Sequence, residues 1–290
     1  MSSPAIQWYP GHIAKAERQL QEQLKRVDVV LEVRDARIPL ATHHPLVKGW
    51  IGDKDRVLVL NRMDMISSDV RQGWDEWFRA RGDVPFFTDA KQGKGVGGLV
   101  QRAKAAGFSV NQRRGDRGML PRPVRAVVMG FPNVGKSALI NRLLNKKVVE
   151  SARRPGVTRQ LRWVRISKEL ELLDAPGVLP SQLDDQDAAL KLAICDDIGE
   201  AAYDNQRVAA AFIDILKHLY DERPNLCPAS LLEDRYKLDL TTMTGESYLV
   251  MLAQEKYQND AERAARQLLN DYRKGILGML PLEVPPFDSV

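Results

Sequence analysis

Short apolar segments alternate with amphipathic ones along the first 180 residues of the chain, and this alternation predicts an α/β fold. The apolar segments are rich in β-branched side chains, as buried strands are. The six predicted strands are residues 27–33, 57–60, 84–87, 126–129, 161–166 and 170–173. Because helical patterns lie between most of them, we predict a doubly wound, mainly parallel sheet with helices on both faces.

From about residue 185 onward the pattern becomes helical throughout. In residues 259–275, for example, apolar side chains recur on one face of a single helix, and Asn259 or Asp260 can cap its start and Gly275 its end. The apolar positions are Ala261, Ala264, Ala265, Leu268, Leu269 and Tyr272. We therefore predict two domains, an α/β domain over 1–184 and a small all-α domain over 185–290.

A linker is predicted inside the first domain, at about residues 107–123. Its main part, from Asn111 to Pro123, is polar, contains glycine and proline, and has no periodicity. Such a composition is typical of irregular chain.

Charge is unevenly distributed along the chain. The net charge is +5, but residues 200–290 hold 10 of the 43 basic and 15 of the 38 acidic residues, so the earlier part carries +10 and the later part −5. The segment Lys146–Lys168 contains eight basic residues and one acidic residue, and a second basic run spans Arg113–Arg125. The runs flank one candidate phosphate site in the sequence, which favours a polyanionic partner, whereas a solvated charged surface is the alternative.

Cysteine content and hydropathy narrow the class of protein further. The two cysteines lie far apart, at Cys195 and Cys227, which excludes a disulfide framework and indicates a reducing compartment. No apolar run reaches the length of a signal peptide or a membrane span. We therefore expect a cytoplasmic protein. Hydrophobic residues make up 44% of the chain, which is enough for a substantial core.

The clearest chemical motif spans Gly130–Ser137, which matches GxxxxGK[ST] between a predicted strand and a predicted helix. Glycines in such a loop let backbone N–H groups surround a phosphate, and the helix that follows adds a favourable dipole. Lys136 is expected to reach the outer phosphates and Ser137 to bind Mg²⁺. A Gly-rich structural turn is the alternative, and the strand–loop–helix context argues against it.

Three further residues, all after the phosphate loop in the sequence, are predicted to complete the phosphate site. Asp174 ends an apolar strand, where its carboxylate can hold Mg²⁺ directly or through water. Gly177 has a backbone N–H that can meet a γ-phosphate. Thr158 is a loop hydroxyl placed to complete the Mg²⁺ shell, with an unrelated turn threonine as the alternative.

The base is predicted from two segments that precede the phosphate loop. Asn61, Arg62 and Asp64 end one apolar strand, and Ala90 and Lys91 follow another. A carboxylate such as that of Asp64 accepts two hydrogen bonds from guanine and none of this kind from adenine. The backbone N–H of Ala90 can donate to guanine O6. These segments therefore predict GTP and GDP as ligands.

Together these segments resemble the five motifs of GTPases, in the order G4, G5, G1, G2, G3. This is the circularly permuted arrangement, in which the usual sheet is cut after the DxPG strand and the old ends are joined through a linker. The segments QWYPGHIAKA (7–16) and VRDARIP (33–39) further resemble the YlqF/RbgA family of ribosome-biogenesis GTPases. The resemblance covers the chain through Gly177 and, more weakly, the helical tail.

The resemblance implies a hydrolase that binds GTP and acts in assembly of the large ribosomal subunit. Ras-like enzymes carry a water-orienting glutamine where this chain has Val178, so slow intrinsic hydrolysis is expected. The family points to His12 as the residue that positions water, with helix capping as the alternative. Potassium-activated GTPases carry an asparagine at the position of Asn133, which implies K⁺ beside the phosphates. Arg62 departs from the usual lysine, which puts nucleotide affinity in question.

The predicted site can be stated as four sets of residues. The catalytic residues are His12, Lys136 and Gly177. The GTP-binding residues are Asn61, Arg62, Asp64, Ala90, Lys91, Asn133, Val134, Gly135, Lys136, Ser137, Ala138, Thr158 and Gly177. The metal ligands are Ser137, Thr158 and Asp174 for Mg²⁺ and Asn133 for K⁺. The RNA-binding residues are Lys146, Lys147, Arg153, Arg154 and Arg159.

The predicted partners are the large ribosomal subunit or its precursor and its rRNA, with no membrane and with a monomeric protein off the ribosome. The family's helical domain implies an RNA contact at residues 185–290. Two other readings stay open. One is a GTPase switch with a protein-only partner, and the other is a metabolic P-loop ATPase or kinase, against which Asp64 argues.

Overall fold

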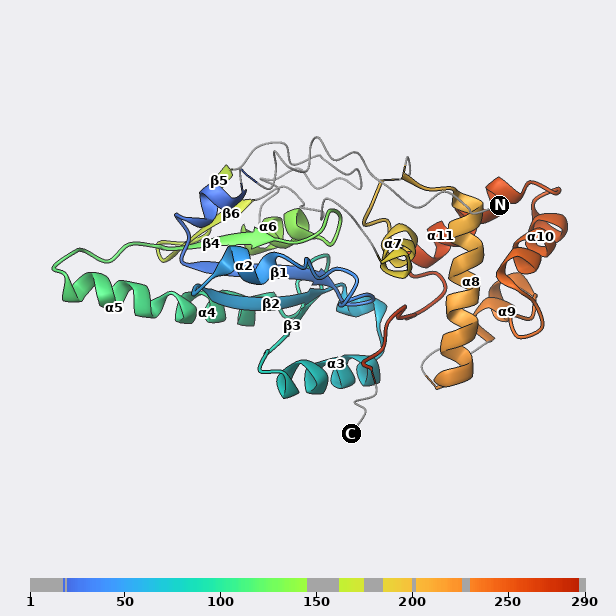
Figure 1. Cartoon of the computed structure of the whole chain (residues 1–290), viewed down its shortest axis with the longest axis horizontal. Helices are drawn as coiled ribbons and strands as arrows, with labels where there is room; N and C mark the ends of the chain where they lie inside the picture. Colours follow the sequence, from blue (N-terminus) through green and yellow to red (C-terminus); the bar gives the residue numbers. More distant parts are fainter. Residues whose placement is uncertain are drawn as a thin grey trace. The chain divides into compact units, whose positions relative to one another are not determined.

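The structure is a computed structural model of the chain, and it describes residue 18 and residues 20–144, 162–174, 185–199, 202–225 and 230–286 (Figure 1). These residues divide into two compact units. The α/β unit consists of residue 18 and residues 20–63, 75–144 and 162–174. The helical unit consists of residues 64–74, 185–199, 202–225 and 230–286. The predicted domain boundary at residues 184 and 185 stays a prediction.

A six-stranded sheet forms the centre of the α/β unit, with the strand order β3-β2-β1-β4-β6-β5. The strands are β1 (Val29–Asp35), β2 (Asp55–Asn61), β3 (Phe86–Thr88), β4 (Val124–Met129), β5 (Arg162–Arg165) and β6 (Leu170–Asp174). All neighbours pair in parallel except β5 and β6, which are antiparallel. The six predicted strands and the mainly parallel sheet are therefore confirmed.

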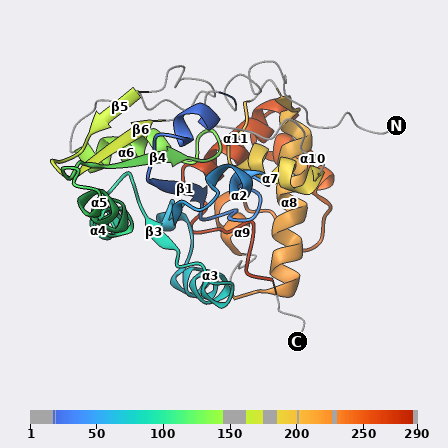
Figure 2. The same ribbon diagram turned by 60° about the vertical axis from the view of Figure 1, so that its left-hand side comes forward.

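Helices cover both faces of this sheet. The helical elements of the first half of the chain are α2 (Val47–Ile51), the 3-10 turn η1 (Met63–Met65), α3 (Ser68–Ala80), α4 (Val96–Ala106), α5 (Phe108–Asp116) and α6 (Lys136–Leu144). The β1–β2 and β3–β4 connections run in opposite directions across the sheet, so right-handed crossovers place α2 and α4 on opposite faces (Figure 2).

A buried apolar cluster lies between the sheet and α2. Val30 of β1 pairs in register with Val127 of β4, so both side chains point to the same face. There they form a buried cluster with Leu173 of β6 and with Val47 and Ile51 of α2. Burial of such side chains stabilises the fold by about 1.5–3 kcal/mol each.

The predicted linker is not irregular throughout, because α5 includes its first polar residues. Arginine and glutamine favour a helix nearly as well as leucine does. Within the described chain no residue of α5 is buried, so no apolar period marks this helix in the sequence. It ends where Gly118 adopts a left-handed φ of 69° and its N–H bonds the carbonyl of Gly115.

The second half of the chain forms the helices of the helical unit. They are α7 (Gln186–Ile194), α8 (Asn205–Glu222), α9 (Ser230–Tyr236), α10 (Gly245–Lys256) and α11 (Ala261–Arg273). The side chain of Asp260 caps α11 by accepting from the N–H of Arg263, as one of the two predicted caps. The aromatic rings of Phe212 and Tyr272, on α8 and α11, pack 4.8 Å apart between centroids.

Residues 64–74 belong to this helical unit although they follow β2 in the sequence, and the division between the units falls inside α3. Two close approaches within the unit explain the grouping. A Cβ added at Gly275 would meet Met65 Sδ at 3.2 Å, and one added at Gly73 would meet Pro285 Cγ at 3.2 Å. The described helices include none long and apolar enough to cross a membrane.

Candidate nucleotide-binding site

The candidate site lies at the carboxyl edge of the sheet. Strands β1, β2, β3 and β4 are parallel, so their carboxyl ends meet at one edge, where open α/β sheets bind ligands. The strands end at Asp35, Asn61, Thr88 and Met129. Each strand end is followed by a segment that the sequence singles out, and three of these segments contact one another directly.

The phosphate loop has the backbone that its glycines require. Gly130 and Gly135 have φ values of 152° and 100°, and Asn133 is left-handed at 56°. A Cβ at Gly130 would overlap the carbonyl oxygen of Val33, and one at Gly135 would overlap the side-chain amide of Asn61. Only glycine fits these two positions, and the loop ends at the N-terminus of α6. This cradle fits a phosphate group.

The motif residues at the start of α6 lie where a phosphate ligand needs them. Lys136 is buried, and its ammonium group donates to the carbonyl of Phe131 at 2.6 Å, which keeps the charge inside the loop. Ser137 and Ala138 follow in the first turn of the helix and are half-buried. The Ser137 hydroxyl is a hard oxygen ligand of the kind that Mg²⁺ prefers.

Asn61 connects three loops through its side-chain amide. Its Nδ2 donates to the carbonyl of Val134 at 2.9 Å, which holds the phosphate loop. Its Oδ1 accepts from the backbone N–H of Ala90 and from the hydroxyl of Thr88, both at 3.1 Å. Asn61 is 2% exposed, so these hydrogen bonds are made away from water and are costly to lose. The predicted donation from Ala90 to guanine O6 stays a prediction, and this N–H would share it with Asn61.

Arg62 makes the second connection between the base segment and the phosphate loop. Its Nη2 donates to the carbonyl of Asn133 at 2.7 Å, and its Nε lies 3.3 Å from Asp35 Oδ2. Asp35 is fully buried and also accepts from Arg37 Nη2 at 2.7 Å and Nε at 3.0 Å. Burial alone would raise the pKa of Asp35, but Arg37 and Arg62 outweigh it and hold the pKa below its usual value.

The segment after β3 is fixed by two residues. Asp89 Oδ1 accepts from the backbone N–H groups of Lys91 and Gln92, both at 2.9 Å, so the Asp89 side chain caps a turn. Arg142 of α6 donates to the carbonyl of Ala90 at 3.3 Å and to that of Lys91. The helix that starts at the phosphate loop thus also positions the base segment.

The predicted residues can now be placed. Asn61, Arg62, Ala90, Asn133, Val134 and Gly135 contact one another as described. Asp64 lies in η1, three residues after Asn61, and its side chain and that of Lys91 are exposed. The backbone of Asp174 ends β6 opposite Val128 of β4, and its side chain is not described. His12, Lys146, Lys147, Arg153, Arg154, Thr158, Arg159 and Gly177 lie outside the described residues.

Sequence reasoning missed the charged residues that support the loops. Asp35 and Arg37 lie in the segment VRDARIP, but the resemblance gave neither residue a role, and Arg142 binds a carbonyl 52 positions away. Asp35 had one signal, since a carboxylate at the end of an apolar strand, two residues before an arginine, is a candidate for a buried ion pair. Clusters of three or more His, Cys, Asp or Glu that could hold a metal do not occur in the described part of the chain.

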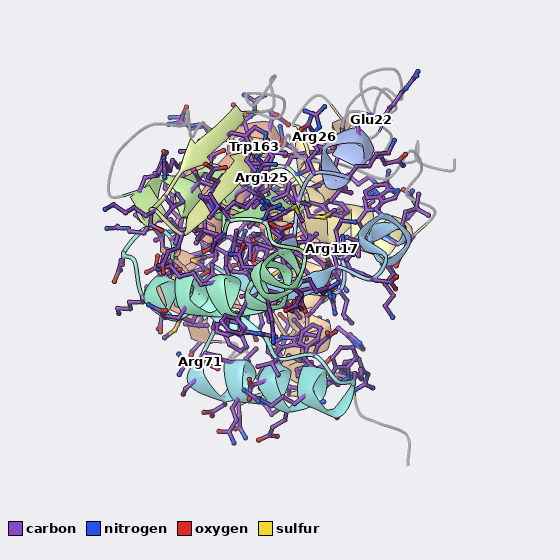
Figure 3. The ribbon with its side chains drawn as sticks, turned by 90° about the vertical axis from the view of Figure 1, so that its left-hand side faces the viewer. Glu22, Arg26, Arg71, Arg117, Arg125 and Trp163 are labelled. Atoms are coloured by element: carbon purple, nitrogen blue, oxygen red, sulfur yellow. The ribbon has the colours of Figure 1, made fainter. Side chains whose placement is uncertain are left out.

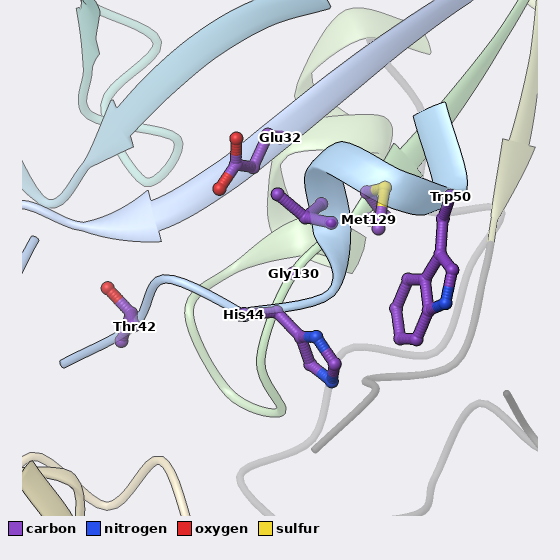
Figure 4. A pocket seen from close by; sticks show the side chains of 7 residues that line it. Glu32, Thr42, His44, Trp50, Met129 and Gly130 are labelled. Atoms are coloured by element: carbon purple, nitrogen blue, oxygen red, sulfur yellow. The ribbon is translucent and has the colours of Figure 1, made fainter. Parts of the chain in front are cut away.

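A small cavity of about 10 Å³ lies beside the phosphate loop and is lined by Glu32, His44 and Trp50, among others (Figure 4). The His44 and Trp50 rings pack 4.3 Å apart between centroids, so His44 is a packing residue. Glu32 is buried, which alone would raise its pKa, but Arg34, His43 and Arg56 hold the pKa far below its usual value. The ion pair of Glu32 with Arg56 joins β1 to β2, whereas that with Arg34 lies within β1.

These contacts define a P-loop nucleotide site in which the base segments precede the phosphate cradle along the chain. The class of protein is therefore a circularly permuted GTPase, with the phosphate loop on the fourth strand in sequence order and next to the first in the sheet. Comparison with known proteins agrees. The sequence model described as "50S ribosome-binding GTPase" matches residues 125–241.

Whole-chain relatives narrow the class to a family. Ribosome biogenesis GTPase A of Bacillus cereus is 34% identical over 97% of this chain and 94% of its own length. The protein of the same name from Priestia megaterium is 38% identical over 81% of this chain and 79% of its own length. The crystal structure of GNP-bound YlqF from T. maritima shares the fold, with a TM-score of 0.62 and 22% identity over 93% of this chain and 98% of that chain.

The chain belongs to the ribosome biogenesis GTPase A (YlqF/RbgA) family. The predicted family, the permuted GTPase fold and GTP hydrolysis are thereby confirmed, as is guanine nucleotide as the ligand.

Proposed function

We propose that this GTPase acts in assembly of the large ribosomal subunit and that its nucleotide state controls its association with the ribosome. One observation supports the nucleotide part most directly. The Asn61 amide binds both the Val134 carbonyl and the Ala90 N–H, so the base and phosphate segments form one continuous site. The names of the relatives support the ribosomal part.

In the proposed complex, each loop meets one part of GTP. Asp64 accepts two hydrogen bonds from guanine, and the Ala90 N–H donates to O6. Backbone N–H groups of the phosphate loop and the Lys136 ammonium hold the β- and γ-phosphates. Gly177 donates its backbone N–H to the γ-phosphate. Water attacks the γ-phosphorus, the bond to the β–γ bridging oxygen breaks, and GDP and phosphate leave.

The proposed metal ligands are Ser137, Thr158 and Asp174 for Mg²⁺ and Asn133 for K⁺. Hydroxyl, carboxylate and amide oxygens suit these cations. When bound, the cations would supply positive charge beside the phosphates, as an arginine finger does in other GTPases. Equal turnover in sodium and potassium salts would count against the K⁺ assignment.

His12 is proposed to position the attacking water, since Val178 has no group that can. The test is His12→Ala. Lost turnover with unchanged GTP affinity supports this role, whereas unchanged stimulated turnover contradicts it.

The proposed ribosomal contacts are rRNA phosphates at Lys146, Lys147, Arg153, Arg154 and Arg159, with the helical domain, residues 185–290, as a further contact. These basic residues surround Thr158 in the sequence, so RNA bound there would sense the γ-phosphate. We infer a protein that is monomeric off the ribosome and cytoplasmic, where its partner is.

The deciding experiment measures GTP turnover in KCl with purified large ribosomal subunits, with small subunits, and alone. The proposal is supported if large subunits strongly stimulate GTP turnover and small subunits do not. The variant Lys136→Ala, which lacks the phosphate-binding ammonium group, should show no stimulated GTP turnover. If neither subunit stimulates turnover, the ribosomal partner is wrong, and the alternative of a GTPase switch with a protein-only partner gains support.

A further inference from the structure

Helix α5 presents apolar and basic side chains to solvent together. None of its nine residues is buried, and Phe108 at its start is 70% exposed. Leu120, in the turn that follows, is 82% exposed. The basic residues of α5 and its end therefore lie between two exposed apolar side chains in the sequence, and both kinds of side chain are available to a partner.

The second basic run, Arg113–Arg125, does not lie at the nucleotide site. It precedes β4, whereas the phosphate loop follows β4, so the two lie at opposite ends of this strand. A strand of six residues is roughly 17–20 Å long. The basic run Arg113–Arg125 is therefore close to the phosphate loop in sequence but not in space, and it has no role in holding GTP.

Part of the basic charge near α5 is neutralised by the α/β unit. Arg122 makes a bidentate ion pair with Asp28, with N–O distances of 2.6 and 2.8 Å. Lys104 pairs with Glu169 at 2.5 Å, and Arg125 lies 3.7 Å from Glu171. Of these pairs, the one between Arg122 and Asp28 attaches the segment after α5 to the residue that precedes β1.

Three arginines of α5 and its end remain without a carboxylate partner among the described residues. Arg113 donates to the carbonyl and hydroxyl of Ser109, and Arg114 donates to the carbonyl of Leu120. Arg117 makes no side-chain hydrogen bond or ion pair within the described ranges. A single acidic residue, Asp116, lies among them. The helix therefore presents a surplus of positive charge.

The surface formed by α5 and the turn after it is preorganised by contacts within the α/β unit. The Asn111 side chain donates to the Arg122 carbonyl at 2.9 Å and accepts from its N–H at 3.1 Å, which joins α5 to the strand that returns into β4. Gly107, between α4 and α5, has no room for a Cβ beside Val124. Preorganised charge costs less entropy on binding than charge on a flexible tail.

An open groove of about 730 Å³ lies beside α5, lined by Phe108, Asn111, Lys104 and Lys168, among others. Figure 3 views this end of the α/β unit, with Arg117 at the end of α5 and Arg125 and Trp163 on the strands. The Arg125 guanidinium lies 5.6 Å from the centroid of the Trp163 ring. The groove combines an aromatic side chain, amide groups and cations with one carboxylate, that of Glu169, which is paired with Lys104. Aromatic side chains and cations together are typical of sites that bind unpaired nucleic acid.

We propose that α5 and the turn after it bind a single-stranded segment of RNA. Arg113, Arg114 and Arg117 contact its phosphates, and Phe108 stacks on an unpaired base at the mouth of the groove. The choice of RNA over other polyanions rests on the proposed ribosomal function. The surface itself is separate from the nucleotide site, since the two lie at opposite ends of β4.

The test uses the full-length protein and two fluorescein-labelled probes of equal length, a single-stranded RNA and an RNA duplex. Binding is measured by anisotropy across a series of KCl concentrations. The triple variant Arg113→Ala/Arg114→Ala/Arg117→Ala should lose about tenfold or more in affinity at low salt. Its log–log salt slope should fall by about 2, since each phosphate contact on a single strand contributes about 0.7.

Phe108→Ala separates stacking from charge. It should weaken single-stranded RNA binding by roughly 5- to 100-fold, leave the duplex nearly unaffected and keep the salt slope. The matched control, Lys48→Ala/Arg71→Ala/Arg79→Ala, removes three exposed basic residues elsewhere and should bind as the wild type does. Thermal unfolding should be unchanged, because α5 buries none of its side chains.

Three outcomes would overturn the proposal: equal RNA affinity in the triple variant and the wild type, equal losses in the triple variant and the control, or competition by polyglutamate as strong as that by RNA. Its failure can be told apart from failure of the proposed function. Basal GTP turnover should be normal in the α5 variants. A protein that binds RNA through α5 but is not stimulated by large subunits would contradict only the ribosomal role.

Discussion

The guanidinium group of Arg62 donates to the backbone carbonyl of Asn133 at 2.7 Å and so joins the base segment to the phosphate loop. Both residues have left-handed backbones, with φ values of 64° and 56°. The same guanidinium group forms an ion pair with Asp35, with 3.3 Å between Arg62 Nε and Asp35 Oδ2. Arg62, which stands where a lysine is usual, thus contacts the loop and pairs with a buried carboxylate.

Arg62→Ala should weaken GTP and GDP binding alike by about 10- to 100-fold, because a charge-assisted hydrogen bond that positions the loop is lost. Arg62→Lys should lose less, since an ammonium group can bond the Asn133 carbonyl. Fluorescence titration with labelled GDP measures both. Arg79→Ala, an exposed change, is the control, and an Arg62→Ala affinity equal to that of the control would refute the role.

Replacing Asp64 should change the choice of base rather than the affinity for phosphates. In Asp64→Asn, the side-chain amide offers a donor where the carboxylate accepted, so GTP should bind at least tenfold more weakly and xanthosine triphosphate better. Competition between the two nucleotides measures the preference. A variant that still prefers GTP over xanthosine triphosphate as the wild type does would show that another residue reads the base.

The Asn61 side chain can be divided into its two functions. Asn61→Asp keeps the acceptor for the Ala90 N–H but removes the donor to the Val134 carbonyl, whereas Asn61→Ala removes both. Each lost buried hydrogen bond costs about 1–3 kcal/mol. Nucleotide affinity and melting temperature should therefore fall in both variants, and no less in Asn61→Asp, which also sets a buried carboxylate against the Val134 carbonyl. Calorimetry with and without GDP would measure both quantities.

The stability of the protein should fall in acid because of Asp35. Its pKa is lower in the fold than in the unfolded chain, where it is about 3.9. Between these two values the unfolded state binds more protons, so the free energy of unfolding rises with pH. The contribution is complete above about pH 4 and is lost as the pH falls through the pKa of the folded state.

Urea denaturation at a series of pH values from 3 to 6 would measure this. Asp35→Asn should remove part of the pH dependence and about 3–5 kcal/mol of stability at neutral pH, since Arg37 stays buried without its partner. The exposed change Asp53→Asn should do neither. A wild type and an Asp35→Asn variant with parallel pH profiles would contradict the prediction.

Asp271 should be the most sensitive polar residue of the helical unit. It is fully buried and accepts from Arg235 at 2.9 Å, from the Tyr236 hydroxyl at 2.8 Å and from Gln267 at 2.7 Å. Burial and the Asp271 carboxylate raise the pKa of Tyr236. Asp271→Ala should destabilise this unit by about 3 kcal/mol in urea denaturation, and Tyr236→Phe by about 1 kcal/mol. Equal effects would mean that the other partners contribute nothing.

Much of this molecule follows from local sequence, because strands and the phosphate loop are local units. The short apolar segments rich in β-branched residues predict all six strands, and GxxxxGK[ST] predicts the phosphate loop that contains Gly130 and Gly135. What the sequence could not predict depends on distant partners. The ion pair of Asp35 with Arg62 and the clamp of Arg142 on the segment after β3 join residues dozens of positions apart. Helix α5 was missed for another reason, since a helix with no buried face has no apolar period.

The order of the strands also has a consequence for synthesis. Strands β1, β2 and β3 leave the ribosome first, carrying Asn61 and Ala90, while β4 and Val134 are still unmade. Until β4 pairs with it, β1 has an open edge that a foreign strand could occupy. The nascent chain therefore contains the base-reading residues well before it has a cradle, and it becomes able to hold GTP only when translation has passed the middle of the message.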